Sequence, residues 1–357
     1  MDDRLRQAAG AAVERGIDFL EEVVASNGGW PCWRYDDTAL VGDRHLEYPP
    51  FAAALGLLAL DACDHPGTRA LVARTREFIR SFMQYPGIWS YPGLPPSVDD
   101  TAICALAAGP HPWLRMGRLL GLNLDVMLSH RDGDGRFLLW MPGDDWPPGL
   151  DNEVDAVVNA NVLAYMGDHA ETRAARRWLE TVVADRREAE ASPYYIEPVD
   201  LHFALARAGR FRDGIFSGLR PTLASRILER LDDDGGFGDP MRTAQALSAL
   251  DMIVFDLDAA MLAAIVRSLV EAQRRDGSWR PCLAWKEPPG WAVWVAANEG
   301  PRHVRPPRGF ASEAMTTAFC IEALQRSLRS SGSAAAGAQS PSSSRAQKSR
   351  NTASRAR

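Results

Sequence analysis

Two adjacent carboxylates, Asp99 and Asp100, stand at the start of an apolar segment in the run Ser97-Val98-Asp99-Asp100-Thr101. A neighbouring carboxylate raises the pKa of a carboxylic acid by like-charge repulsion. Paired carboxylates in a cleft can therefore divide into one group that holds a proton and one that has lost it. The pair predicts acid catalysis, with one carboxyl group kept protonated.

A second polar group lies in the apolar segment that begins at Glu153. Asp155 and Asn159 are four residues apart and share one face of a helix, and Asn161 follows them although Asn is a poor helix former. Two interpretations stay open. The group caps the helix and bonds to neighbouring helices, or it forms a polar cavity wall, with Mg²⁺ if the substrate is a diphosphate.

Acidic residues stand near the start of every expected inner helix, where each is most simply a cap or first-turn acid. In a closed ring of helices they would meet at one rim; they are Glu47 (beside Tyr48), Asp99, Asp100, Glu153, Asp155, Glu197, Asp200, Asp239 and Glu313. We include Tyr48 among the candidate substrate-binding residues. His202 is either a wall histidine or a partner that orients a catalytic Asp. Arg242 is either a salt-bridge partner or a phosphate ligand.

The elements that position these groups form a repeat. Five helical stretches end in a glycine followed two residues later by a large aromatic, at Gly28–Trp30, Gly87–Trp89, Gly135–Phe137, Gly235–Phe237 and Gly277–Trp279. The glycine stands where a helix terminates in a left-handed residue. The aromatic can then fold back on the stack. Such self-similarity indicates a repeat architecture.

Amphipathic outer helices alternate with more apolar inner helices six times. The expected outer helices are Leu5–Ala25, Thr68–Gln84, Trp113–His130, Thr172–Arg186, Arg220–Leu231 and Asp258–Arg274. The expected inner helices are Tyr48–Asp61, Val98–Ala108, Glu153–Met166, Pro198–Ala208, Pro240–Met252 and Ser312–Gln325. No convincing strand is present. We predict an all-α (α/α)6 toroid over residues 1–327, with an open helical solenoid as the alternative. Two insertions, 133–150 and 281–309, hold further candidates for a cavity wall: Trp140, Trp146, Trp285, Trp291 and Trp294.

Composition bounds the possible functions. The net charge is −6 over 357 residues, but residues 328–357 carry six basic side chains and no acidic one. The rest of the chain, residues 1–327, is therefore acidic, which argues against nucleic acid as the main partner. The basic Ser/Ala-rich tail, residues 328–357, is expected to be disordered. Five scattered cysteines without a CxxC pair favour a reducing cytoplasm. The sequence shows no transmembrane segment, no signal peptide and no zinc-ligand spacing.

Three motifs resemble those of one superfamily. Leu269-x3-Gln273-x3-Gly277-x-Trp279 resembles the "QW" repeat of squalene-hopene cyclase and its relatives. Ser97-Val98-Asp99-Asp100-Thr101-Ala102 resembles the D-x-D-D-T-A motif of class II terpene cyclases, with Ser97 in place of the first Asp. Thr316-Thr317-Ala318-Phe319 resembles the T-A-W/F pattern of the same repeats. Over roughly residues 1–327 the chain resembles the prenyltransferase/squalene-cyclase repeat superfamily.

The resemblance implies a terpene cyclase-like enzyme of isoprenoid (terpenoid) biosynthesis. In it, Asp99 is the general acid of a protonation-initiated cyclisation of a linear isoprenoid or isoprenyl diphosphate. Asp100 and Ser97 would orient Asp99, and Glu153, Asp155, Asn159 and Asn161 would form the polar wall. The Asp-x-Cys and His zinc ligands of protein prenyltransferases are absent. Class II cyclases usually place the site between two domains, so a second domain in trans or a partner subunit would be implied here.

Two other functions stay open at this stage. The chain could be a non-catalytic subunit that binds an isoprenoid or a protein. It could also be a carbohydrate-active toroid that uses a carboxylate pair, for which carboxyl groups ~5–9.5 Å apart in an open cleft would be needed.

Overall fold

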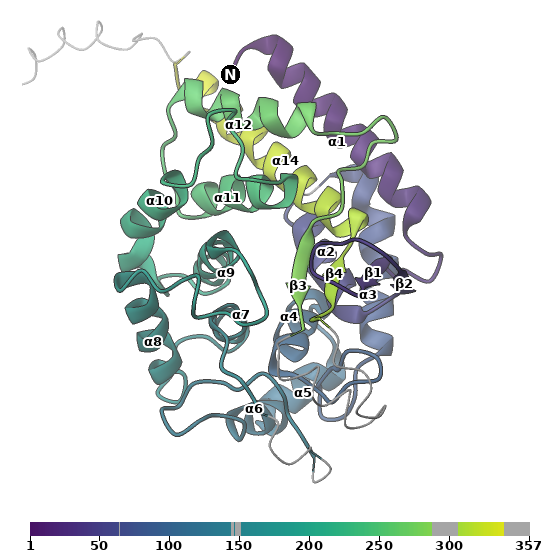
Figure 1. The fold of residues 1–357 in the computed structure, drawn as a ribbon, viewed down its shortest axis with the longest axis vertical. Helices are drawn as coiled ribbons and strands as arrows, with labels where there is room; N and C mark the ends of the chain where they lie inside the picture. The colour runs from purple at the N-terminus through teal and green to yellow at the C-terminus, as the bar shows by residue number, and fades with distance from the viewer. Residues whose placement is uncertain (64, 144–145, 147–150, 288–305, 339–357) are drawn as a thin grey trace, which may run out of the picture.

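The computed structural model describes residues 1–63, 65–143, 146, 151–287 and 306–338. Six inner helices of this part of the chain contact one another in a closed ring, and the last contacts the first. In order around the ring they are α2 (Pro50–Asp61), α4 (Val98–Ala108), α7 (Ala156–Met166), α9 (Pro198–Phe211), α11 (Pro240–Met252) and α14 (Glu313–Ala338). Figure 1 shows them around the centre of the molecule. The sequence predicts this closed arrangement, and the open solenoid is wrong.

The outer layer consists of helices that bury only one face. They are α1 (Asp3–Val23), α3 (Arg69–Ser81), α5 (Pro112–Leu119), α6 (Leu122–Leu128), α8 (Arg173–Ala184), α10 (Arg220–Leu228) and α12 (Ala259–Glu271), with 3-10 turns η1 (Pro66–Thr68) and η2 (Ser217–Leu219). In α3 the buried residues fall at helical spacing, whereas every residue of the inner helix α7 is buried. One outer helix was expected over Trp113–His130; it is instead interrupted near Gly121, which adopts a left-handed conformation.

Two of the repeated aromatics each join an outer helix to the next inner helix. The indoles of Trp89 and Trp279 are fully buried, and their Nε1 atoms donate to the carbonyls of Ile79 (2.8 Å) and Leu269 (2.7 Å) at the ends of α3 and α12. Their backbone N–H groups donate to Thr101 Oγ1 in α4 (3.1 Å) and to a threonine in α14. The aromatic therefore serves as a structural clamp.

Gly277 shows why the aromatic is preceded by glycine. Its φ is +87°, and a Cβ at this position would lie 2.2 Å from the carbonyl oxygen of Arg15 in α1. Just before it, Gln273 Nε2 donates to the carbonyls of Ala12 (2.8 Å) and Gly277 (2.9 Å). The Gln-x3-Gly-x-Trp motif thus joins the last outer helix to the first.

A small sheet corrects the expectation of an all-α chain. β1 (Cys32–Tyr35), β2 (Arg44–Glu47), β3 (Leu283–Lys286) and β4 (Gly309–Ala311) form an antiparallel sheet in the order β2-β1-β4-β3. Strands of three or four residues are too short to display a reliable alternation of apolar and polar residues. The sheet joins the loop after α1 to the loops before α14, and in Figure 1 it lies beside α2 and α4.

The last helix also differs from expectation. It was expected to end at Gln325, yet α14 continues to Ala338 and so includes the first part of the predicted tail; residues 339–357 lie outside the described part. Within the described residues, no helix combines the length and apolar character needed to cross a bilayer.

Candidate active site

A pocket opens where the inner helices α2, α4 and α7 begin, and the small sheet and the loop before α9 cover one side of it. It holds about 610 Å³ of empty space, including its opening. Its lining comprises Phe51, Tyr91, Leu94, Asp99, Asp100, Leu139, Trp140, Val158, Tyr194, Tyr195, Trp285, Lys286, Glu287 and Phe310. Most of this surface is aromatic or aliphatic, and both aspartates of the predicted motif are part of it.

Asp99 is held by two hydrogen bonds from distant parts of the chain. Its side chain is 5% exposed. Oδ1 accepts from Asn161 Nδ2 in α7 (2.7 Å), and Oδ2 accepts from the hydroxyl of Tyr195 (2.7 Å). Burial raises the pKa of Asp99 above its ordinary value, although these two bonds and the charge of Arg207 act in the opposite direction. The geometry is that of an oriented acid beside an apolar pocket.

Asp100 has a different environment. Ser97 is the N-cap of α4: its Oγ accepts from the backbone N–H of Asp100 (2.9 Å) and donates to Asp100 Oδ2. The other carboxyl oxygen, Oδ1, is buried and has no hydrogen-bond partner among the described residues. Burial, supported by the charge of Asp99, raises the pKa of Asp100 to about 7. Ser97 therefore orients Asp100 and makes no such bond to Asp99, where Asn161 and Tyr195 take that role.

Aromatic rings that contact one another form part of the same pocket wall. Trp285 in β3 stacks on Phe310 in β4, with ring centroids 5.6 Å apart, and meets Phe51 edge-on at 5.3 Å. Tyr91 packs edge-on against Phe310 at 5.7 Å. Aromatic faces attract cations through their quadrupole. A pocket that pairs a buried acid of raised pKa with such rings suits a reaction that passes through a carbocation.

Comparison of the sequence with models of protein families and with curated proteins finds no match. Comparison of the structure finds several. Type II terpene cyclase MstE from Scytonema, in complex with geranylgeranyl dihydroxybenzoate, matches with a TM-score of 0.65 at 16% identity, over 91% of this chain and 99% of that chain. A protein from Actinoplanes matches with a TM-score of 0.68 at 19% identity, over 89% and 99%.

This chain has a class II terpene cyclase-like fold. The ent-copalyl diphosphate synthase from Streptomyces platensis also matches, with a TM-score of 0.53 at 17% identity, over 78% of this chain and 50% of that chain. The helical toroid is not confined to terpene cyclases, since an alpha-amylase from Clostridium perfringens matches with a TM-score of 0.53 at 11% identity, over 88% and 97%. At these identities the comparisons establish the fold, and the chemistry has to be argued from the pocket.

Two of the expected wall residues are structural in this terpene cyclase-like toroid. Asp155 is the N-cap of α7 and accepts from Val158 N (3.0 Å), Ser192 Oγ (2.7 Å) and Tyr194 N (3.1 Å). Asn159 pairs with the backbone of Phe137 through both ends of its amide. Neither lines the pocket. Asn159 occupies the place of Thr101 in α4, which receives the equivalent aromatic N–H.

Other expected residues lie away from Asp99. The ring of His202 is buried and faces Glu188, with Nε2 and Oε1 3.5 Å apart, so it orients no catalytic Asp. Arg242 is buried between Asp200 (3.0 Å) and Asp239 (3.4 Å), as a salt-bridge partner rather than a phosphate ligand. Two further candidates, Tyr48, which is 40% exposed, and Glu153, which is half-buried and bonded to Tyr194, are not among the pocket-lining residues.

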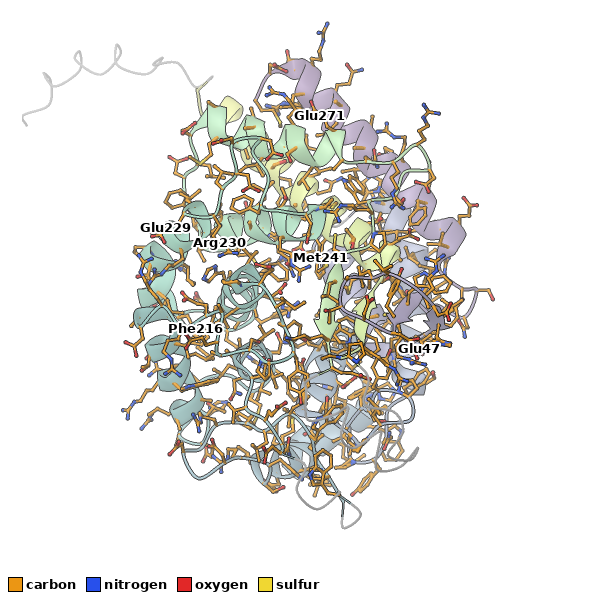
Figure 2. The ribbon with its side chains drawn as sticks, viewed as in Figure 1. Glu47, Phe216, Glu229, Arg230, Met241 and Glu271 are labelled. Atoms are coloured by element: carbon orange, nitrogen blue, oxygen red, sulfur yellow. The ribbon has the colours of Figure 1, made fainter. Side chains whose placement is uncertain are left out.

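Most of the acidic residues expected at the rim have an arginine partner. Glu47 pairs with Arg34, Glu197 with Arg230, Asp200 and Asp239 with Arg242, and Glu313 with Arg274. In Figure 2, Arg230 lies toward the outer edge of the ring of helices. Among the described residues no three His, Cys, Asp or Glu side chains are grouped to hold a metal ion.

The structure adds residues that the sequence did not suggest. Tyr195 bonds to Asp99, and Arg207 Nη2 donates to Asn161 Oδ1 (2.7 Å), on the far side of the amide that holds Asp99. In the sequence, Arg207 is marked only by being a cation in the middle of an otherwise apolar stretch of an inner helix. Of the insertion tryptophans, Trp140 and Trp285 line the pocket and Trp146 does not; Trp291 and Trp294 lie outside the described residues.

Proposed function

We propose that this protein is a class II terpene cyclase in which Asp99 protonates a linear isoprenoid and so starts its cyclisation. The observation that carries the proposal is the position of Asp99: a buried carboxyl group at the wall of an aromatic pocket, held by Asn161 and Tyr195. The terpene cyclase-like fold supports it.

The chemistry follows from the residues that face the substrate. The Asp99 O–H bond breaks and its proton forms a C–H bond with one alkene carbon, using the π electrons of that alkene. The positive charge left on the other carbon is attacked by the next alkene, and loss of a proton ends the sequence, so product and substrate are isomers. Trp285 and Phe310 would stabilise the cation. The Asp99 carboxylate then has to recover a proton before the next turnover.

The apolar pocket favours an isoprenoid over a sugar. A glycosidase needs two carboxyl groups on opposite sides of the scissile bond, whereas Asp99 and Asp100 are neighbours at the start of α4. The lining holds a third acid, Glu287. It forms an ion pair with Arg308, in which a carboxylate oxygen lies 3.7 Å from Nη1.

Mass spectrometry of reaction products tests the proposal. Purified wild-type protein and the variants Asp99→Asn and Asp258→Asn are incubated with linear isoprenoids and isoprenyl diphosphates, with and without Mg²⁺. Asp258 is the matched control because it caps the outer helix α12, where Asn caps equally well. We expect a cyclised isomer from wild type and Asp258→Asn, and at least ~10²-fold less from Asp99→Asn.

Two results would contradict the proposal. Full activity in Asp99→Asn would remove Asp99 from the acid role. Absence of any product, with prenyl lipid co-purifying with both wild type and Asp99→Asn, would instead favour a non-catalytic isoprenoid-binding subunit.

A further inference from the structure

Arg207 is a buried cation whose place in the structure needs a reason. It lies in the inner helix α9, 6% exposed, and forms no salt bridge within the described part of the chain. The acidic groups that act on it are Tyr195, Asp99 and Glu322. Its guanidinium lies over the ring of Phe203, 5.1 Å from the centroid. Burying an unpaired cation is costly, so a contact that needs this particular side chain is expected.

That contact is the hydrogen bond to Asn161. A guanidinium group only donates hydrogen bonds, so the atom that Asn161 presents to Arg207 has to be its carbonyl oxygen. The NH2 end of the same amide then faces Asp99 and donates to Oδ1. In the opposite orientation the carbonyl would face Asp99 and accept the acid proton. Arg207 thereby fixes which end of the amide meets Asp99.

The orientation decides where the Asp99 proton points. With its NH2 group donating to Oδ1, Asn161 cannot take the acid proton, and Tyr195 donates to Oδ2. Asp99 lines the pocket, so its proton can be donated to a substrate there. When the proton leaves, the Asp99 carboxylate keeps both hydrogen bonds. The positive charge of Arg207 lies on the other side of the Asn161 amide.

We propose that Arg207 is a positioning residue that holds the Asn161 amide in one orientation, directs the Asp99 proton toward substrate and stabilises the carboxylate formed when that proton is donated. This inference rests on the proposed function. It assigns a role to a cation that is not among the residues lining the Asp99 pocket.

Three substitutions separate this role from a structural one. Arg207→Lys keeps the positive charge, and lysine, like arginine, can only donate hydrogen bonds. It should therefore still require the carbonyl end of the Asn161 amide to face position 207. Arg207→Met removes the charge and the donors but keeps an apolar stem that fits a buried site. Arg226→Met is the control, since Arg226 is an arginine of the outer helix α10 whose side chain is 10% exposed and pairs with Glu188.

The first readout is the pH dependence of turnover. Because the active form has Asp99 protonated, the rate falls as pH rises through the pKa of Asp99. We expect Arg207→Met to lower kcat by about 10–10²-fold with little change in KM and to move this fall by about 1 pH unit toward higher pH, because it loses an attractive charge. Arg207→Lys should restore most of kcat and the wild-type profile, and Arg226→Met should leave the profile in place.

The second readout does not need turnover. The infrared band of the protonated Asp99 carboxyl group, assigned by its loss in Asp99→Asn, is titrated in wild type, Arg207→Met and Arg207→Lys. We expect a higher midpoint in Arg207→Met alone. Equal midpoints in the three proteins would overturn the inference, as would equal losses of kcat in Arg207→Met and Arg207→Lys. If wild type shows no cyclisation, the proposed function fails, and this titration still decides the role of Arg207.

Discussion

Replacing Asp155 by alanine should destabilise the protein far more than the loss of an ordinary helix cap. The cap to Val158 N contributes about 1 kcal/mol. Two further donors, Ser192 Oγ and the N–H of Tyr194, would be left unpaired in a buried place, at ~1–3 kcal/mol each. The sum is about 5 kcal/mol, within a range of ~3–7 kcal/mol. Since burial raises the pKa of Asp155 to about 7, work at pH 6 keeps the carboxyl mostly protonated and limits the effect of a buried charge.

The assay is urea unfolding followed by circular dichroism, with Asp258→Ala as the matched control. Asp258 caps α12 through Ala260 N and Met261 N on an exposed surface, so its loss should cost only about 1 kcal/mol. The difference between the two variants isolates the bonds to the loop before α9. A loss in Asp155→Ala no larger than in Asp258→Ala would refute the structural role and return Asp155 to the substrate wall.

Two more predictions follow from the fold. Burial raises the pKa values of three carboxyl groups, to about 7 for Asp100 and Asp155 and to about 8 for Glu322. Between pH 5 and 8 the folded state therefore holds protons that the unfolded state has released, and stability to urea should fall as pH rises, by a few kcal/mol; a rise would contradict this. Gly277→Ala should lower the melting temperature markedly because its Cβ meets the α1 backbone, whereas Gly42→Ala, also at positive φ but in open space, should cost about 1 kcal/mol; equal losses would refute the close approach.

The fold could be predicted largely from local patterns. The bounds of α4 and α11 agree with expectation to the residue, because caps such as Ser97 and Asp239 and runs of small and apolar residues mark them. The break at Gly121 escaped prediction because one glycine inside a helical pattern is often tolerated. The sheet escaped because its strands are short and pair across most of the chain.

The site could be predicted only in part. The Asp99-Asp100 pair and Asn161 were found from local composition. Tyr195 could not be assigned, since it lies 96 residues from Asp99 in sequence and nothing local marks the contact. The arginine partners of the rim acids could not be assigned for the same reason, since several of them, such as Arg230 for Glu197, are distant in sequence.

The join between the two ends of the chain has a consequence for synthesis on the ribosome. Ser312 Oγ donates to the carbonyl of Pro31, 281 residues earlier, and α1 packs on α14. In an open repeat array each repeat can pack against the preceding repeat as it leaves the ribosome. Here the first helices keep apolar surface uncovered until the last pair has been made. Such distant contacts form slowly and leave the nascent chain prone to aggregation, so its productive folding is expected to be a late, concerted event that depends on chaperones.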